Sequence, residues 1–530
     1  MPRLAPVTSA TRPSSLPMSL FLRPPHRRRA AAILSTARLR PARRRRRLVR
    51  AGRRGPADKA RARMRRLGRR LPGDRVVRRA RRRSETVRVS TIQRRNFRPR
   101  PWMVPAAFAL LIVLGALLLS LPISSESGEW TNGWDALFTA TSAICVTGLV
   151  RFDTADQFSF FGELVIVVLI QLGGLGVTMY AGMLILFVGG QFGLRGRDFF
   201  GIELIGDAER DVRRLLRRAA LFVFTLEAVT FLLLLPWSLT KWDPAPAVWR
   251  AFFHALSASN CAGFDLMGGG RGFSGQVDEP YPLLVMGTAA FLGSISFITV
   301  FNLRTRPRRW SLDTRLVVIG MVAMQLMAML VFASLELRVG NPLSGLNPFE
   351  ALANIYFLAV NRTTGMSTVE IAALEDASIA ILIPLMFIGG ASTSTASGIK
   401  IGTFMVSLVV ILSALRGRHS AQVFGREIPQ AIVLRATAVT LLGVFLLAGG
   451  LSLLLLFEDG PFLPLLFEVM SGLANVGWSM GSTGDLSERG VILLTVLMFI
   501  GRLGPLIVAI SIPDRPQERY RYPYGRVRIG

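Results

Sequence analysis

Four short strings containing glycine recur along this chain, and their residue types and spacing indicate chemistry. Each string follows a moderately apolar stretch and carries a glycine at a matching place. The strings are residues 143–149, 259–265, 361–368 and 474–480, and their glycines are Gly148, Gly263, Gly365 and Gly477. Four copies of one unit predict pseudo-fourfold symmetry around an axis.

A ring of backbone carbonyls from four such loops is suited to binding a dehydrated monovalent cation. Backbone oxygens replace the hydration shell without a permanent charge that would trap the ion. Glycine lets each loop turn its carbonyl inward through backbone angles closed to other residues. A helix ending before each glycine would also point its negative C-terminus at the cavity. The predicted filter, with a monovalent cation as its only metal, comprises Val146, Thr147, Gly148, Cys261, Ala262, Gly263, Thr363, Thr364, Gly365, Asn475, Val476 and Gly477. No Thr-Val-Gly-Tyr-Gly string occurs, so we expect a shorter filter than that of a potassium channel.

Long apolar segments that must position these loops begin at Pro101, in a chain that is 51% hydrophobic. Eight segments reach the roughly 20 residues that a helix needs to cross a bilayer: 101–123, 158–189, 217–239, 280–303, 314–337, 377–415, 431–457 and 489–513. Four stretches are too short to span and are interpreted as re-entrant half-helices: 134–147, 248–262, 347–363 and 461–476. We therefore predict an all-α polytopic membrane protein with four helix–loop–helix units around a central pore.

The net charge of +31 lies entirely in residues 1–100, which hold 33 Arg and one Lys against three acidic residues. Such a composition cannot bury enough apolar surface to fold, so we predict a disordered tail. The tail is interpreted as an arm that contacts anionic lipid headgroups, or as a coding start placed too far upstream. A transit peptide and nucleic-acid binding are the alternatives, and the second is disfavoured because no aromatic interleaving accompanies the arginines.

Basic residues in alternate connections orient the chain. The loops 195–218, 304–315 and 416–435 are rich in Arg, and the other connections nearly lack Lys and Arg. The positive-inside rule places these loops and both termini in the cytoplasm, in agreement with an even number of spans. The predicted division is 1–100 (tail), 101–190 (unit 1), 191–303 (unit 2 with its preceding loop), 304–415 (unit 3), 416–513 (unit 4) and 514–530 (cytoplasmic tail).

The second span of unit 3 is interrupted by small and polar residues. Unwound backbone at membrane depth is tolerated where it lines a cavity, so this segment is placed to plug the pore below the filter. The alternative is a small-residue face for helix packing. The candidate gate residues are Gly389, Gly390, Ser392, Thr393, Ser394, Thr395, Ser397, Gly398, Lys400 and Arg502.

Charged residues in or near the spans give further hypotheses. Arg502 would face the interior and pair with the gate, or it would snorkel to a helix end. Asp265 and Asp485 follow filter loops, where they would concentrate cations or cap turns. Glu163 and Glu227 are interpreted as residues near the membrane interfaces.

Several strings together resemble the Trk/Ktr/HKT superfamily of potassium transporters, and the Ktr-type membrane subunit most closely. The resemblance covers nearly all of residues 101–530 and leaves out the tail. The strings that carry it are 138–142 with 146–149, 260–265, 362–368, 467–469 with 477–481, 386–390 with 394–400, and 501–505.

This resemblance implies potassium uptake across the plasma (cell inner) membrane. Four filter glycines imply potassium selectivity, and Gly148 separates the chain from plant relatives that carry serine there and favour sodium. A sodium-permeable or sodium-coupled transporter of the same superfamily is the alternative, with Na+ as a coupling or activating ion. No covalently bound cofactor is implied. The segment around Lys400 corresponds to the intramembrane gate of the family.

Family members work as homodimers on a ring of cytosolic regulatory subunits that bind nucleotides, of the KtrA/TrkA type. This chain has no Gly-rich dinucleotide fingerprint, so nucleotide control would come from such a partner. The loops 190–218 and 304–315 and the tail 514–530 are the expected docking surface.

Other classes of function fit less well. A carrier of larger solutes predicts inverted repeats and a charged pocket at the midplane, whereas these units share one orientation. No nucleophile–base pair, metal cluster or phosphate loop is visible, so an enzyme is not expected. The two cysteines, Cys145 and Cys261, suggest neither a disulfide scaffold nor a metal site.

Overall fold

A computed structural model describes residues 103–175, 208–269, 272–418 and 420–511 of the chain. All of them belong to one compact unit, Gln93–Gly530. The Arg-rich tail 1–100, most of the first basic loop and the C-terminal tail 514–530 lie outside the described residues. The predictions about them therefore stay predictions.

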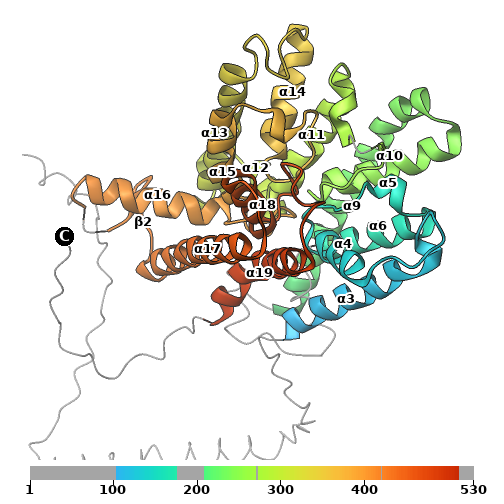
Figure 1. Cartoon of the computed structure of the whole chain (residues 1–530). Helices are drawn as coiled ribbons and strands as arrows, with labels where there is room; N and C mark the ends of the chain where they lie inside the picture. The colour runs from blue at the N-terminus through green and yellow to red at the C-terminus, as the bar shows by residue number, and fades with distance from the viewer. Residues whose placement is uncertain (1–102, 176–207, 270–271, 419, 512–530) are drawn as a thin grey trace, which may run out of the picture. The chain divides into compact units, whose positions relative to one another are not determined.

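The described part is built almost wholly from helices (Figure 1). The α-helices are α3 (Met103–Ser120), α4 (Gly133–Cys145), α5 (Thr154–Gln157), α6 (Phe160–Gly174), α9 (Ala208–Lys241), α10 (Pro244–Ser259), α11 (Pro280–Ser294), α12 (Phe297–Leu303), α13 (Leu312–Leu335), α14 (Pro348–Asn361), α15 (Asp376–Phe387), α16 (Ile401–Leu415), α17 (Gln430–Phe457), α18 (Phe462–Ala474) and α19 (Glu488–Ser511). Short 3-10 helices are η1 (Pro122–Ser124), η2 (Gly272–Gln276), η3 (Pro307–Arg309) and η4 (Ile371–Ala373). Strands β1 (Gln422–Val423) and β2 (Arg426–Glu427) form a small antiparallel hairpin.

Polar caps and prolines mark where several helices begin. The Ser159 hydroxyl accepts the Gly162 N–H at the start of α6, and the Ser311 hydroxyl accepts the Thr314 N–H at the start of α13. Each cap satisfies a backbone donor that the first helical turn leaves unpaired. The half-helices α10 and α14 begin with proline, which has no N–H to satisfy.

Contacts between helices repeat in the same order through all four predicted units. The half-helices α4, α10, α14 and α18 each pack against the long helix before them, respectively α3, α9, α13 and α17. The helices that follow pack onto the next half-helix along the chain: α6 on α10, α11 on α14 and α15 on α18. The last of these helices, α19, packs on the first half-helix, α4, so the order closes on itself. In Figure 1 the red α19 accordingly lies beside the cyan α4.

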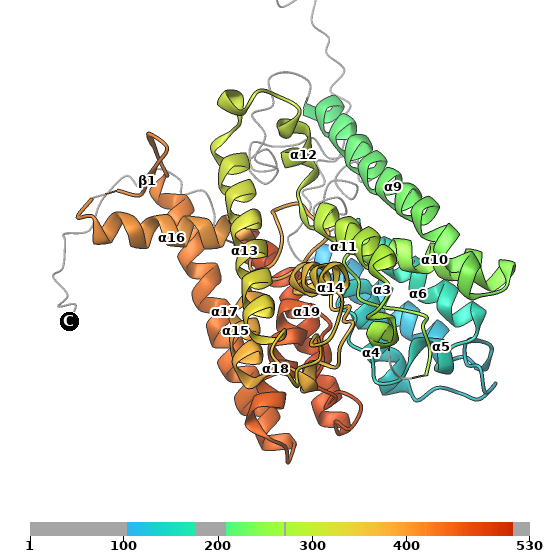
Figure 2. The same ribbon diagram turned by 90° about the horizontal axis from the view of Figure 1, so that it is seen from above.

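The second helices of units 2 and 3 are not straight. α11 and α12 meet at an angle of 96°, and a loop of residues 388–400 separates α15 from α16. Figures 1 and 2 show α16 and the hairpin projecting from the side of the bundle, next to α17. The predicted interruption in the span 377–415 thus coincides with a loop between two helices.

By length and apolar composition alone, three stretches of the described chain are able to cross a membrane: Leu216–Lys241, Leu312–Leu335 and Gln430–Phe457. The bent pair α11 and α12 adds a fourth if it counts as one span. Other predicted spans contain shorter apolar helices, namely Val104–Ser120, Phe160–Gly174, Asp376–Phe387 and Ile401–Leu415. The fold is that of a mostly helical membrane protein, and the number of eight spans stays a prediction.

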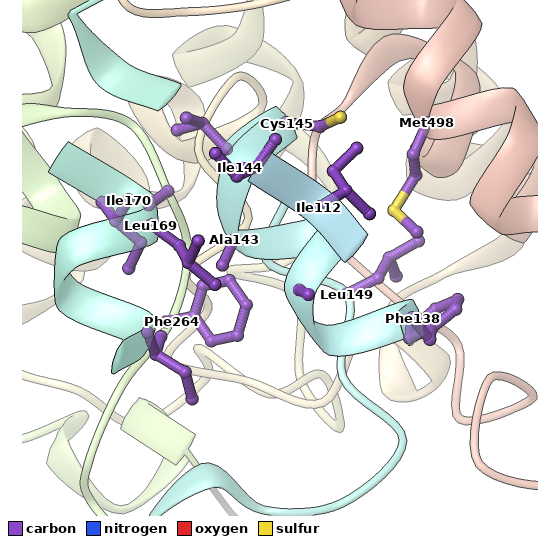
Figure 3. Close-up of a cluster of buried hydrophobic side chains, with 14 of the residues drawn as sticks. Ile112, Phe138, Ala143, Ile144, Cys145, Leu149, Leu169, Ile170, Phe264 and Met498 are labelled. Carbon is purple, nitrogen blue, oxygen red and sulfur yellow. The ribbon is translucent and has the colours of Figure 1, made fainter. Parts of the chain in front are cut away.

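One apolar core joins the first and last units. Figure 3 shows Ile144 and Leu149 of unit 1 in a cluster with Met498 of α19 and Phe264 of the loop after α10. These side chains come from three of the four predicted units. Because they are fully or almost fully buried, burying them stabilises the closed arrangement of units as well as each helix pair.

Close packing of α19 on α18 depends on Gly501. A Cβ at this position would collide with the Leu473 carbonyl and lie 2.9 Å from the Asn475 Oδ1. Gly449 in α17 is a matched control, because no atom lies within 4 Å of a Cβ placed there.

We expect Gly501→Ala to lower the thermal unfolding midpoint of the purified protein, at a cost of roughly 1–3 kcal/mol from overpacking. Gly449→Ala should leave the midpoint unchanged or raise it slightly, because alanine favours helix. Equal midpoints for the two variants in a melting experiment in detergent would contradict this packing.

Candidate functional site

Three of the four half-helices end in the same backbone motif. The residue two places before the filter glycine has a positive φ in each case: 57° at Val146, 57° at Cys261 and 52° at Asn475. The next N–H in each unit bonds back five residues, for example from Thr147 to the Ser142 carbonyl at 2.8 Å. This Schellman arrangement satisfies carbonyls at the helix end. A β-branched valine with positive φ is strained, and such strain is concentrated at functional sites.

The third half-helix ends differently. The N–H groups of Thr364 and Gly365 both donate to the Asn361 carbonyl, at 2.9 and 2.8 Å. Thr363 is not among the residues with positive φ. The backbone of unit 3 therefore leaves its half-helix in a different conformation from that of the other three units.

The four filter glycines lie next to one another. A Cβ on Gly148 would be 2.8 Å from the Cα of Gly263, and a Cβ on Gly263 would collide with the Thr364 carbonyl. A Cβ on Gly365 would be 2.7 Å from the Cα of Gly477, and one on Gly477 would be 3.1 Å from the Cα of Gly148. Each glycine thus faces the loop of the next unit, and the fourth faces the first.

Backbone carbonyls occupy this ring. The four glycines have φ between 78° and 104°, which L side chains rarely adopt. The carbonyl oxygen before each glycine is the atom that a Cβ on the preceding unit's glycine would meet: Ala262 O for Gly148, Thr364 O for Gly263, Val476 O for Gly365 and Thr147 O for Gly477. The structure therefore brings all four predicted loops together and lines their meeting point with oxygens.

The candidate gate loop, residues 388–400, contacts the filter loop of unit 2 and the end of α11. The Thr395 hydroxyl donates to the Gly293 carbonyl at 2.9 Å and to the Cys261 Sγ at 3.4 Å. The backbone N–H groups of Ala391 and Thr395 donate to carbonyls at the end of α11. These carbonyls are free to accept because α11 ends at the bend before α12.

A parallel bridge between Ile388 and Ile399 closes the base of the loop. The Gly389 N–H donates to the Ile399 carbonyl at 2.9 Å, and the Lys400 ammonium donates to the Ala396 carbonyl at 2.5 Å. The Thr393 hydroxyl hydrogen-bonds that of Ser296 at 2.6 Å. The remaining candidates differ in their surroundings: Gly390, Ser397 and Gly398 are buried, Ser394 is half-buried and Ser392 is exposed.

Arg502 ties the gate loop to two other units. Its guanidinium donates to the Thr395 carbonyl at 2.8 Å, to the Ser397 hydroxyl, and to the Gly173 carbonyl at the end of α6 at 2.7 Å. The side chain is only 7% exposed. This is the geometry of an interior charge and differs from that of a snorkelling side chain.

Arg362 is a second buried arginine beside the gate, and the sequence interpretation missed it. It lies three residues before Gly365, is 2% exposed, and donates to the carbonyls of Leu385 and Ile388 at 3.3 and 2.5 Å. These carbonyls lie at the end of α15, where the helix dipole favours a cation. Arg362 thus links the third filter loop to the start of the gate loop. A charge within three residues of a filter glycine is the signal that would have identified it.

Glu227 is buried inside the helical bundle, and its position near a membrane interface stays a prediction. It is 5% exposed and accepts a hydrogen bond of 2.7 Å from the Asn260 amide, next to the second filter loop. Glu163 accepts the Trp249 indole N–H at 2.5 Å. Trp478, which follows the fourth filter glycine, is buried and donates to the Met366 carbonyl at 3.0 Å.

Comparison with known proteins agrees with the class that this geometry defines, a helical membrane transporter. The TrkH family, described as cation transport proteins, matches residues 90–521. The chain belongs to this family and is therefore a transporter and not an enzyme.

Two relatives named for potassium or potassium/sodium uptake match along nearly their whole length. The Ktr system potassium uptake protein B of Bacillus subtilis (strain 168) is 36% identical over 82% of this chain and 97% of its own length. The potassium/sodium uptake protein NtpJ of Enterococcus hirae is 30% identical over 83% of this chain and 100% of its own length. The crystal structure of the potassium transporter TrkH from Vibrio parahaemolyticus matches with a TM-score of 0.60 at 18% identity, over 79% of this chain and 86% of that one, which shows the fold alone. The resemblance to a Ktr-type membrane subunit is confirmed.

Asp265 lies in the loop after the second filter glycine, outside the membrane-spanning helices. Its carboxylate accepts the Met267 N–H at 3.1 Å, so it caps a turn. Burial raises the pKa of Asp265 from its ordinary 3.8 to about 6, and the nearby Asp153 carboxylate adds to this rise. The folded state then binds the proton more tightly than the unfolded chain. The stability that Asp265 contributes is therefore full below about pH 3.8 and lost as pH rises through about 6.

We expect Asp265→Asn to melt at a higher temperature than the wild type at pH 7, with the difference shrinking toward pH 4, because asparagine keeps the acceptor and removes the half-buried charge. Thermal melts of the purified protein across this pH range measure the effect. Asp485→Asn, an exposed position in the loop of unit 4, is the control. A pH-independent difference for Asp265→Asn would refute the assignment.

Proposed function

We propose that this chain takes up potassium across the plasma membrane through a filter made by the loops around Gly148, Gly263, Gly365 and Gly477. The closed ring of these glycines, with a backbone carbonyl beside each, is the observation that carries the proposal. A ring of carbonyls binds a dehydrated cation. The names of the relatives for potassium uptake support the choice of ion.

The proposed architecture is a pseudo-fourfold pore of eight spanning helices and four re-entrant half-helices. The repeating contacts of α4, α10, α14 and α18, each with a helix of the neighbouring unit, support it. The predicted division into four units and the cytoplasmic placement of both termini are part of this proposal. The C-termini of three half-helices, capped by the same motif, present negative dipole ends toward the ion.

Sodium permeation or coupling is the second candidate. The relative from Enterococcus hirae is named a potassium/sodium uptake protein, and it aligns over its full length. Na+ would then be a second transported, coupling or activating ion. The resemblance to the family supports potassium, because it associates glycine at all four filter positions with potassium selectivity.

We further propose that the chain works as a homodimer with a cytosolic nucleotide-binding ring. Names of relatives as members of a Ktr system support a multi-component assembly. Within the proposed docking surface, the segment 304–315, which joins α12 to the first turn of α13, carries exposed arginines such as Arg306 and Arg308.

Restored growth at limiting potassium tests the transport function. Expression in a strain lacking potassium uptake should support growth, and comparison with and without sodium separates the two candidate ions.

Gly148→Ala should lower potassium uptake about tenfold or more, equal to about 1.4 kcal/mol of barrier, because its Cβ would press on the Ala262 carbonyl at 2.5 Å. Gly128→Ala is the control, since Gly128 also has a positive φ but no atom within 4 Å of its Cβ. Loss of uptake in both variants alike would contradict a filter at Gly148.

Opening of the gate loop is the second test. Arg502→Ala removes the charge-assisted bonds that hold Thr395 and Ser397, each worth roughly 1.5–3 kcal/mol. We therefore expect potassium flux through the chain alone in liposomes to rise about tenfold or more, since 1.4 kcal/mol is tenfold. Shortening the segment 390–397 should raise flux in the same way. Arg338→Ala, at an exposed arginine that pairs with Glu375, should have no effect, and unchanged flux in the first two variants would exclude a gating role.

A further inference from the structure

Two buried serines hold the filter glycines from behind. The Ser142 Oγ in α4 accepts the Gly148 N–H at 3.1 Å, and the Ser471 Oγ in α18 accepts the Gly477 N–H at 3.0 Å. Each serine lies six residues before its glycine and is 0% exposed. In each of these two units, a serine hydroxyl on the half-helix thus accepts a hydrogen bond from the N–H of the filter glycine.

A trans peptide couples this bond to the direction of a carbonyl. The C=O and N–H of one peptide unit point in opposite directions, and the described residues contain no cis peptide bond. Pulling the Gly148 N–H toward Ser142 therefore directs the Thr147 carbonyl away from the helix and into the ring. The Thr147 carbonyl does lie against Gly477, and the Val476 carbonyl lies against Gly365.

In units 2 and 3 the filter glycine is not held by a serine hydroxyl in this way. Unit 3 has Ala359 at the corresponding place, and its Gly365 N–H donates to the Asn361 carbonyl at 2.8 Å instead. Unit 2 has Ser257, whose hydroxyl donates to the Phe264 carbonyl at 2.6 Å, one residue beyond the glycine. Only units 1 and 4, which are neighbours in the ring, hold the glycine N–H with a side chain in this structure's described residues. The filter is therefore supported unequally around its circumference.

We propose that Ser142 and Ser471 are positioning residues that set the filter's preference between potassium and sodium. This inference rests on the proposed function of the ring. Without the hydroxyl, a buried N–H would lack its acceptor, and the peptide would turn to find another. The Thr147 or Val476 carbonyl would then leave the position that matches a dehydrated potassium ion. Selectivity falls when the coordinating carbonyls move, whereas the pore itself stays open.

The experiment compares potassium and sodium flux through the reconstituted full chain and its Ser142→Ala and Ser471→Ala variants. We expect each variant to lower the potassium-to-sodium flux ratio about tenfold, equal to about 1.4 kcal/mol, with total cation flux retained. Ser142→Thr keeps the hydroxyl and should keep the ratio. Because both ions are measured on one preparation, the ratio does not depend on how much protein folds.

Thr141→Val is the matched control. Thr141 is buried beside Ser142 in α4, and its hydroxyl bonds to the Leu137 carbonyl within the helix. Its loss should leave the ratio unchanged. If the alanine variants do not fold, Ser142→Cys and Ser471→Cys have nearly the same shape with a weak acceptor, and they should show the same loss of preference.

The outcomes separate this inference from the proposed function. A chain that conducts neither ion, both as the wild type and with the gate loop released by Arg502→Ala, ends the proposed function, and the role of the serines falls with it. A wild type that prefers potassium, with variants that keep this preference or with Thr141→Val losing it equally, overturns the inference alone.

Discussion

Backbone carbonyls that leave a helix inside the membrane need a positive partner, and this structure is arranged around that demand. An unsatisfied backbone group in hydrocarbon costs several kcal/mol. The chain leaves helical geometry in the four loops after α4, α10, α14 and α18, and again between α15 and α16. In the proposed architecture these segments lie at membrane depth. Most residues of these segments are buried among other helices of the same chain. In the proposed function, a passing cation meets the demand in the filter loops.

In the candidate gate loop, residues 388–400, cationic side chains of the protein meet the same demand. Arg502 takes carbonyls of the loop and of α6, Lys400 takes one at the end of the loop, and Arg362 takes those at the end of α15. Unit 3, which holds this loop, is also the unit whose half-helix ends without the αL residue. Unit 3 therefore differs from the other three units both in its interrupted second span and in the backbone conformation at the end of its half-helix.

Much of the candidate site could be predicted from the sequence, and particular residues show where prediction stopped. Glycine at four matching places predicts four similar loops, because only glycine enters the required region of backbone angles easily. Val146 in the left-handed region is not predictable in this way, because valine disfavours it and only the surrounding packing holds it there. The roles of Ser142 and Ser471 were not predicted, even though serine occurs at three of the four matching positions, the third being Ser257. Aligned strings show the repetition, but only the hydrogen bonds show that two of these hydroxyls accept and one donates.

The sequence by itself determined the local elements: apolar helices, short half-helices, the glycine after each, and the interruption before Lys400. These features depend on hydrophobicity and backbone preference within some twenty residues. The tertiary structure alone decided that α19 closes on α4, that Gly477 faces Gly148, and that Arg502 reaches a loop more than a hundred residues before it. Such contacts depend on how the surfaces of distant helices fit together. That fit is a property of the whole packed bundle, and no single segment encodes it.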